Sequence, residues 1–360
     1  MADYQPKDIR NIAFLGHGSE GKTTLTESML FAAGHIDRQG RVEDGNTVSD
    51  FDPEEIKRSI SINTSVAPVE WKGTKVNIID VPGYFDFVGE MMGPVRVTQT
   101  VGIVINAVNG ITVGAAKAWD MAEKNGLSRM FIVNQMDREN ANFDKVLERL
   151  RETYGGSVVP LLVPIGAGAN FRGVVNVLEG TAFEGANKTL KSIAVPADMT
   201  ARLKDDEMVI TEASAEAIDE LLEKFFSEGE LSHDEVLEGF RAGMKSGKIV
   251  PVVCCSAVTG VGVAPLLDIM KSYLNWPSGT VAEGVNPKNN EPARRKCVNE
   301  EPFSAFVFKT IADPFVGKLS LVRVMSGVLT PATALYNAND EKAEKSGGLF
   351  MLRGKKQSAA

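Results

Sequence analysis

One short glycine-rich segment near the start of the chain has the residue types and spacing of a phosphate-binding loop. It matches the pattern G-x-x-x-x-G-K-[ST] and lies between a strand-like apolar run at 11–15 and a helical pattern at 22–33. In such a loop the backbone N–H groups hold phosphates, the lysine reaches the β- and γ-phosphates, and the final hydroxyl ligates Mg²⁺. A glycine turn that merely begins a helix is the alternative, and the strand–loop–helix context disfavours it. The residues assigned to this phosphate site are Gly16, His17, Gly18, Ser19, Glu20, Gly21, Lys22, Thr23 and Thr24.

Two further segments can complete a site for Mg²⁺ and a γ-phosphate. Asp80 follows an apolar run at 76–79 and opens the sequence Asp-Val-Pro-Gly, so its carboxylate can hold Mg²⁺ through water and the Gly83 amide can meet the γ-phosphate. Ser61 lies in a polar, irregular stretch at 38–62, a candidate mobile loop, and can supply a hydroxyl. Taken alone, these segments are equally typical of a turn after a strand and of a polar loop or edge strand. The predicted metal ligands are Thr23, Ser61 and Asp80.

Two segments farther along can read a purine base. Asp137 closes the sequence Asn-Gln-Met-Asp after a strand-like run, and its carboxylate can accept hydrogen bonds from guanine N1–H and the exocyclic amine. Adenine lacks that pair of donors, so we predict a guanine nucleotide. Backbone N–H groups of a Cys-Ser-Ala turn after another apolar run can contact guanine O6, although each turn alone carries little information. The residues assigned to the base are Asn134, Gln135, Asp137, Ser256 and Ala257.

The elements around these motifs predict an α/β fold with a mostly parallel sheet and helices on both faces. A hairpin is expected from two strand-like runs at 64–71 and 75–80, and the motifs lie at the ends of strands, where ligands bind in such sheets. The predicted strands that follow are 102–107, 130–134 and 249–255, and the predicted helices are 87–99, 113–125, 142–153 and 263–274.

Two departures from the alternation predict further domains. Residues 159–248 form an inserted α+β subdomain in this interpretation, with acidic helices at 212–226 and from Ser232 onward, where Glu235 completes a capping box. The GTP-binding domain would then comprise 1–158 and 249–276. Residues 277–300 are rich in Pro, Asn, Lys and Glu and predict a linker, and the alternating pattern at 301–360 predicts an incomplete β-barrel domain.

The composition limits the other possibilities. A net charge of −8 argues against bulk binding to DNA or other nucleic acid, and no apolar run reaches the roughly 18 residues of a membrane span. The three cysteines have no metal spacing or disulfide framework and fit a reducing cytosol, so we expect a cytoplasmic protein without a signal peptide. Nothing in the sequence requires more than a monomer.

The same motifs, in this order, resemble translational GTPases, and most closely elongation factor G and its paralogues. The resemblance is carried by NIAFLGHGSEGKTTLTESML, PIGAGANFRGVVNVLEGTAF, GVGVAPLLDIMKSYLNWP and PFSAFVFKTIADPFVGKLSLVRVMSGVL, which span nearly the whole chain. It implies GTP or GDP with Mg²⁺ as ligands, the ribosome as partner, and a P-loop GTPase domain followed by a barrel-like domain. The family continues beyond this point, so the chain is expected to be a truncated member.

Four positions depart from the family pattern. Tyr84 stands where the family has a histidine that orients the attacking water, and a phenol is a poor substitute for imidazole at neutral pH. Ser19 replaces an aspartate, Ser61 a threonine and Gln135 a lysine. We therefore predict a GTPase whose hydrolysis is slow or partner-dependent, with Lys22, Gly83 and Tyr84 at the catalytic centre. His17 is expected to pack within its loop.

Two rival functions remain open at this stage. One is a GTP-gated ribosome-binding module that hydrolyses GTP negligibly, which Ser19 and Tyr84 favour. The other is an ATP-using kinase or ATPase with a phosphate loop, which the segment from Asn134 to Asp137 disfavours.

Overall fold

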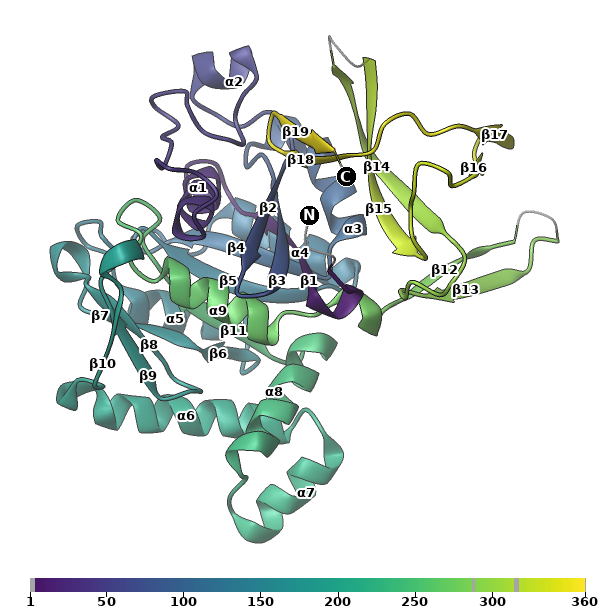
Figure 1. The fold of residues 1–360 in the computed structure, drawn as a ribbon. Coiled ribbons are helices and arrows are strands. Elements are labelled where there is room, and N and C mark those ends of the chain that lie inside the picture. Colours follow the sequence, from purple (N-terminus) through teal and green to yellow (C-terminus); the bar gives the residue numbers. More distant parts are fainter. Residues whose placement is uncertain (1–3, 287–288, 314–316, 360) are drawn as a thin grey trace.

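A seven-stranded sheet forms the centre of the molecule, with strand order β2-β3-β1-β4-β5-β11-β6 (Figure 1). The computed structural model describes residues 4–286, 289–313 and 317–359. All neighbouring strands run parallel except β2, which pairs antiparallel with β3. The strands are β1 (Ile9–Leu15), β2 (Ser65–Trp71), β3 (Thr74–Asp80), β4 (Thr100–Asn106), β5 (Ser128–Asn134), β6 (Val158–Pro160) and β11 (Val250–Cys254).

Apolar residues make the inner strands of this sheet, and helices cover both of its faces. Strands β4, β5 and β11 are buried along their whole length, as expected for parallel strands with helices on either side. Helices α1 and α9 pack together over β2 and β3, and α4 contacts β4 and β5. The predicted fold class is therefore confirmed. The helices are α1 (Lys22–Ala32), α3 (Met92–Val97), α4 (Val113–Lys124), α5 (Phe143–Tyr154) and α9 (Val263–Tyr273).

The loop at 38–62 is more ordered than its sequence indicates. It contains a short helix, α2 (Pro53–Arg58), which the prediction of an irregular stretch missed. A capping box starts this helix: Asp52 accepts a hydrogen bond from the Glu54 N–H, and Glu55 accepts one from the Asp52 N–H. Pro53 at the first helical position fits this start, because its missing N–H would have no partner there.

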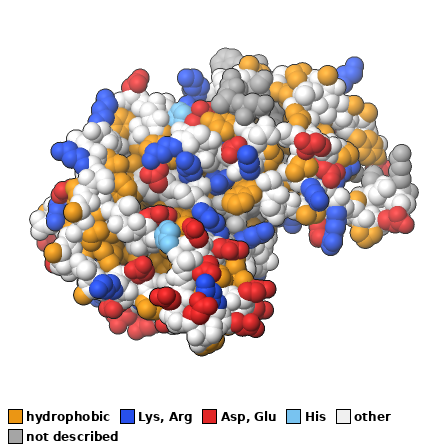
Figure 2. Space-filling model, turned by 60° about the horizontal axis from the view of Figure 1, so that its bottom comes forward, with side chains coloured by type: hydrophobic (Ala, Val, Ile, Leu, Met, Phe, Trp, Pro, Cys, Tyr) orange, Lys and Arg blue, Asp and Glu red, His pale blue; other side chains and the backbone are white. Residues whose placement is uncertain are grey.

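The segment after β6 forms a small sheet and three helices. The sheet is antiparallel, with strand order β10-β9-β8-β7, and its strands are β7 (Leu162–Ile165), β8 (Gly173–Asn176), β9 (Thr181–Glu184) and β10 (Lys191–Ile193). The helices are α6 (Thr200–Ala215), α7 (Asp219–Glu228) and α8 (His233–Ser246), and Figure 2 shows acidic side chains gathered on this part of the surface.

The prediction of a single helix at 212–226 was wrong. Helix α6 ends near Glu216, and the extended backbone of Ile218 separates it from α7. The Ala217 and Ile218 N–H groups bond three residues back, which closes the first helix with tight turns. The capping box predicted at Ser232 and Glu235 is present at the start of α8.

The domain boundaries stay predictions. The boundary placed between 158 and 159 falls inside β6, which pairs with β11 in the central sheet. The predicted domains and linker also extend over residues 1–3, 287–288, 314–316 and 360, which lie outside the described residues.

The predicted linker contains a β-ribbon that composition alone did not indicate. Strands β12 (Val281–Val285) and β13 (Pro292–Lys296) pair antiparallel, and an ion pair of 2.9 Å joins Arg294 to Glu283 across them. Both strands are largely exposed, so they lack the apolar alternation by which strands are recognised in a sequence.

The last part of the chain forms three hairpins. They are β14 (Ser304–Asp313) with β15 (Gly317–Ser326), β16 (Leu335–Asn337) with β17 (Lys342–Glu344), and β18 (Phe350–Arg353) with β19 (Lys356–Ala359). Strand β14 packs against α3, and β18 lies beside β2, so this part contacts the central sheet along one side (Figure 1). Among the helices of the described residues, none has the length and apolar character to cross a membrane.

Candidate functional site

The glycine-rich loop leads from β1 into α1 and takes a shape that only glycine permits at two positions. Gly16 and Gly21 have φ angles of +143° and +85°. A Cβ at Gly16 would lie 2.3 Å from the Val104 carbonyl oxygen, and one at Gly21 would lie 2.6 Å from Asn134 Nδ2. The loop is therefore pressed against neighbouring strands with its amides gathered at the N-terminus of α1, the geometry of an anion site.

Lys22 lies at the centre of this loop. Its Nζ donates to the carbonyl oxygens of Gly16 and His17, at 3.2 and 2.7 Å. Burial lowers the pKa of Lys22 to about 8, although the nearby Asp80 acts in the opposite direction. A Cβ on Gly83 would lie 2.3 Å from Nζ, so the segment after β3 closes directly over the lysine. Lys22 and Gly83 are far apart in the sequence, and they meet in the structure.

The predicted metal ligands also converge. Thr23 Oγ1 lies 3.0 Å from Ser61 Oγ, and both carboxylate oxygens of Asp80 are buried without a hydrogen-bond partner among the described residues. Burial raises the pKa of Asp80 to about 6. Two hydroxyls beside an unpartnered carboxylate form an all-oxygen set of the kind that Mg²⁺ prefers, so the residues fit this ion.

Sequence reasoning missed one member of this cluster, Asp50. Its Oδ2 atom is buried without a partner in the described part of the chain. Burial, and then the charge of Asp80, raise the pKa of Asp50 to about 7. No described group of three or more His, Cys, Asp or Glu side chains could hold a metal, so a cation here would rely on these two carboxylates and the hydroxyls. An isolated acid in a polar loop gives no signal of burial in the sequence.

Two of the departures from the family pattern are neighbours in space. The Tyr84 ring covers the phosphate loop so closely that a Cβ on Gly18 would lie 2.7 Å from it. The Tyr84 hydroxyl is 3.5 Å from Ser19 Oγ, at the outer limit of a hydrogen bond. Ser19 itself has a left-handed backbone, with φ of 64°. The two substituted side chains therefore lie on one side of the loop.

His17 lies on the inner side of the loop, packed against the backbone. A Cβ on Gly114 would lie 2.6 Å from the His17 Cα, and the imidazole ring is 5.7 Å from the ring of Phe85. His17 Nδ1 is buried without a hydrogen bond to the described residues. Glu20 is also buried, and burial raises its pKa to about 7. Thr24 is half-buried in the first turn of α1.

Asn134 and Gln135 connect the loop after β5 to the phosphate loop. Asn134 Nδ2 donates to the Glu20 carbonyl at 3.0 Å, and Gln135 Nε2 donates to the Ser19 carbonyl at 3.0 Å. Gln135 also accepts a hydrogen bond from Asn106 Nδ2 at 2.7 Å. These side chains fix the relative position of two loops that would hold opposite ends of a nucleotide.

The residues assigned to base reading lie together, but two of their amides are already bonded. Asp137 Oδ1 is buried with no partner in the described residues, as expected for an acceptor whose hydrogen-bond donor comes from a ligand. The Ser256 N–H donates to the Val261 carbonyl at 2.9 Å, and the Ala257 N–H donates to Asn134 Oδ1 at 3.0 Å. A base oxygen at this turn would have to share one of these donors.

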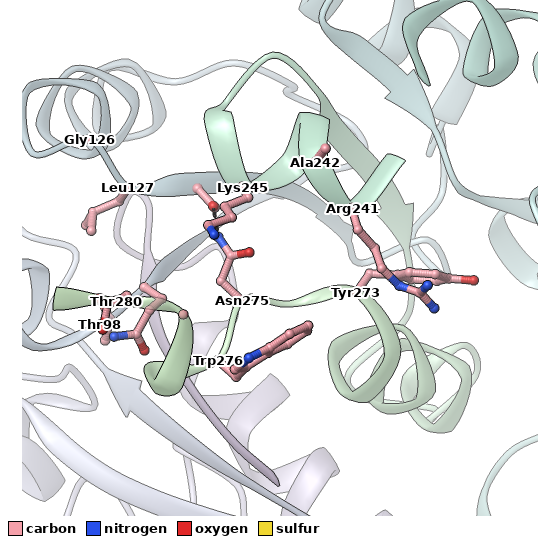
Figure 3. Close-up of a pocket in the computed structure, with 13 residues that line it drawn as sticks. Thr98, Gly126, Leu127, Arg241, Ala242, Lys245, Tyr273, Asn275, Trp276 and Thr280 are labelled. Carbon is pink, nitrogen blue, oxygen red and sulfur yellow. Dashed lines mark hydrogen bonds between the residues drawn. The ribbon is translucent and has the colours of Figure 1, made fainter. Parts of the chain in front are cut away.

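A separate cavity of about 370 Å³ lies away from these loops, at the ends where β4 and β5 begin (Figure 3). Arg241 and Lys245 of α8 reach it from one side, and Trp276 and Asn275 from the other (Figure 3). None of the predicted site residues lines it. The carboxyl ends of the strands, and not this cavity, carry the predicted chemistry.

Comparisons with known proteins agree with this arrangement. The GTP-binding domain of elongation factor Tu matches residues 7–276, and domain 2 of elongation factor G matches residues 302–360. The crystal structure of ttk003000868 from Thermus thermophilus is similar over 98% of this chain, with a TM-score of 0.87 and 30% sequence identity. The matched region is 50% of that protein, so the chain spans half of its length. The chain therefore belongs to the family of elongation factor Tu-type GTP-binding domains, and it is similar to elongation factor G in that a match to domain 2 of that protein follows this domain.

Proposed function

We propose that this chain binds GTP and GDP with Mg²⁺ and hydrolyses GTP slowly, in association with the ribosome in the cytoplasm. The observation that carries nucleotide binding is that Lys22 and Asp80 face each other, and that Asp137 follows β5 at the same edge of the sheet, with buried carboxylate oxygens that lack partners among the described residues. Buried acceptors of this kind are costly unless a ligand supplies cations or donors.

Each residue would have a distinct task. The loop amides and Lys22 would bind the β- and γ-phosphates, and Thr23, Ser61 and Asp80 would hold Mg²⁺, with Asp50 beside them. The bound ion would neutralise phosphate charge. The Gly83 amide would sense the γ-phosphate, and Asp137 would recognise guanine.

Slow hydrolysis is inferred from Tyr84. A water-orienting group must accept a hydrogen bond near the γ-phosphate, and Tyr84 packs over Gly18 with its hydroxyl toward Ser19. It would need to turn away from Ser19 before it could act on water. The alternative, a GTP-gated ribosome-binding module without turnover, rests on the same packing.

The deciding experiment measures GTP turnover by the purified chain, with and without ribosomes, and with ATP as a control. Ribosome-stimulated, GTP-specific turnover would support the enzyme, and Lys22→Ala should abolish it. Tight GTP binding without turnover under either condition would support the binding module. Absence of any guanine-nucleotide binding would contradict both.

Replacement of Asp137 tests the base assignment and the ATP-using rival. Asp137→Asn should weaken GTP binding about 100-fold, because two charge-assisted hydrogen bonds are lost, while weak ATP binding stays the same. Equilibrium titration with both nucleotides measures this, and unchanged GTP selectivity would refute the role of Asp137.

A further inference from the structure

We propose that Lys309, on β14 of the second domain, is a positioning residue that holds both nucleotide-sensing segments in the arrangement that binds GTP. These segments are 61–64, which begins with the predicted metal ligand Ser61, and 83–90, which begins with Gly83. The inference rests on the proposed nucleotide site, and it adds a residue from outside the GTP-binding domain to that site's control.

Lys309 is the point at which the two segments and the second domain meet. Its Nζ donates to Glu90 Oε2 at 2.6 Å, to the Thr64 carbonyl at 3.2 Å and to Asn63 Oδ1 at 3.4 Å. Only 14% of the Lys309 side chain is exposed. A largely buried ammonium with three oxygen partners has few alternative positions, so its geometry constrains all three.

The two segments are also bonded to each other beneath the lysine. Glu90 Oε2 accepts from the Thr64 N–H at 2.6 Å, and Thr64 Oγ1 donates to the Glu90 carbonyl at 2.9 Å. Burial by itself would raise the pKa of Glu90, but the hydrogen bonds from Lys309 and Thr64 hold it below its ordinary value. Glu90 is therefore an ionised acceptor that Lys309 of the second domain and Thr64 of the GTP-binding domain share.

A short chain of contacts leads from this lysine to the metal ligands. The Asn63 and Ile62 N–H groups donate to Glu55 Oε1, at 2.8 and 3.0 Å, so residues 62–64 are held from both sides. The next residue, Ser61, lies 3.0 Å from Thr23 through its hydroxyl. A displacement of Thr64 would therefore be passed within three residues to the Ser61 hydroxyl.

The second domain is firmly seated where Lys309 enters. A Cβ on Gly93 would lie 2.6 Å from the Phe308 carbonyl oxygen, so α3 and β14 approach as closely as glycine allows. Arg323 of β15 donates to the Val97 carbonyl at the end of α3, and Arg96 lies over the ring of Phe306. With β14 fixed on α3 in this way, Lys309 acts as an extension of a rigid support and not as a loose surface cation.

This arrangement predicts that a replacement of Lys309 weakens the binding of GTP more than the binding of GDP. GTP binding needs Ser61 and Gly83 in place, whereas GDP binding depends mainly on the phosphate loop and the base contacts. If Lys309 only joined the two domains, the loss of its bonds would lower the stability of the fold and weaken the binding of GTP and GDP alike. A positioning residue would lower the affinity for GTP specifically, because coupling is a difference between two bound states.

The test is the ratio of Kd values for a fluorescent GDP and a fluorescent non-hydrolysable GTP analogue, in Mg²⁺, for the whole chain. Lys309→Met should shift this ratio about tenfold toward GDP, while Lys309→Arg should retain most of the preference. The matched control is Arg353→Met, which removes a half-buried cation of the second domain that donates to the Pro68 carbonyl of β2 at 3.3 Å, a partner outside α3 and outside residues 61–64. It should leave the ratio unchanged.

The outcomes separate this inference from the proposed function. A ratio unchanged within twofold in Lys309→Met, or shifted equally in Arg353→Met, would overturn the role of Lys309 while nucleotide binding stands. Wild-type protein that binds neither probe would overturn both. Should Lys309→Met fail to fold, Glu90→Gln removes the shared charge with little change of shape. A shift of the Kd ratio toward GDP in that variant would support the role of Lys309, and an unchanged ratio would overturn it.

Discussion

At the scale of single residues, the predicted nucleotide-binding set lies beside Tyr84, the residue proposed to replace a water-orienting histidine. Ser19 and Tyr84 are separate departures in the sequence but neighbours in the structure, with their hydroxyl oxygens 3.5 Å apart. A carboxylate at position 19 would put a charge beside the phenol, so the two substitutions suit each other. The pair offers a direct way to test why hydrolysis would be slow.

Tyr84→His should raise ribosome-stimulated GTP turnover. An imidazole is a better proton acceptor than a phenol near neutral pH, and a well-placed acid or base contributes on the order of 100-fold or more. Single-turnover GTP hydrolysis measures the change, and Tyr84→Phe, which keeps the ring, is the control. Equal rates for the histidine and phenylalanine variants would show that this position does not limit turnover.

Asp50→Asn should stabilise the protein in EDTA without nucleotide, most clearly at pH 8. The folded pKa of Asp50, about 7, lies above its unfolded value, so ionised Asp50 costs stability above that pH, and the cost fades as the pH falls toward 4. The gain in the free energy of unfolding should thus be at most about 4 kcal/mol at pH 8 and become small near pH 4.

Chemical denaturation at both pH values checks this, and the same variant should bind nucleotide less well in Mg²⁺. A variant that is less stable at pH 8 would show that the buried carboxylate is compensated by groups other than a cation.

At the scale of elements, α2 gives the loop at 38–62 a defined shape. Glu55 is 1% exposed and accepts from the N–H groups of Asp52, Ile62 and Asn63. One carboxylate thus starts the helix and fixes the segment that leads into β2. The loop is held by a few specific bonds, which would allow it to rearrange as a unit.

Glu55→Ala should loosen this loop far more than Glu54→Ala. The first leaves three backbone donors without an acceptor, at about 1–3 kcal/mol each if they stay buried, whereas Glu54 forms exposed pairs with Lys57 and Arg58. Trypsin cleavage after Lys57 or Arg58 measures the opening. Similar cleavage rates for the two variants would contradict the role assigned to Glu55.

The element predictions failed where the apolar periodicity of the sequence did not mark the element or its end. The sequence at 212–226 suggests one continuous helix, but tight turns at the end of α6 and the extended backbone of Ile218 divide α6 from α7. The ribbon of β12 and β13 has no apolar alternation, because it has no buried face. Periodicity reports burial, so it cannot reveal an exposed strand or a break between helices that share one surface.

At the scale of the whole molecule, the second domain supports the GTP-binding domain at two places. Besides Lys309, the Gly354 N–H donates to the Val66 carbonyl at 2.9 Å, and a Cβ on Gly354 would lie 1.9 Å from the Val48 carbonyl oxygen. The β18–β19 turn thus contacts both the loop at 38–62, at Val48, and the strand β2 that follows it, at Val66. We expect the two domains to unfold together.

Gly354→Ala should separate the two unfolding transitions. Both Gly354 and Gly317 have positive φ angles, of 52° and 81°, but a Cβ on Gly317 meets nothing within 4 Å. Gly317→Ala therefore carries only the backbone strain, of about 1 kcal/mol, and Gly354→Ala adds the loss of the interdomain contact. Calorimetry should show two peaks for Gly354→Ala alone, and a single peak for both variants would refute the coupling.

The sequence by itself determined the fold class, and it predicted the residues of the phosphate, metal and base motifs, because each motif is a short run whose chemistry depends on adjacent residues and on the strand before it. The family pattern also identified Ser19 and Tyr84 as departures. Only the tertiary structure brought these two side chains together, placed Asp50 beside the predicted metal ligands and put Lys309 against residues 63, 64 and 90. These relations join residues tens to hundreds of positions apart, and burial and contact at such separations follow from how the whole chain packs, which no local pattern encodes.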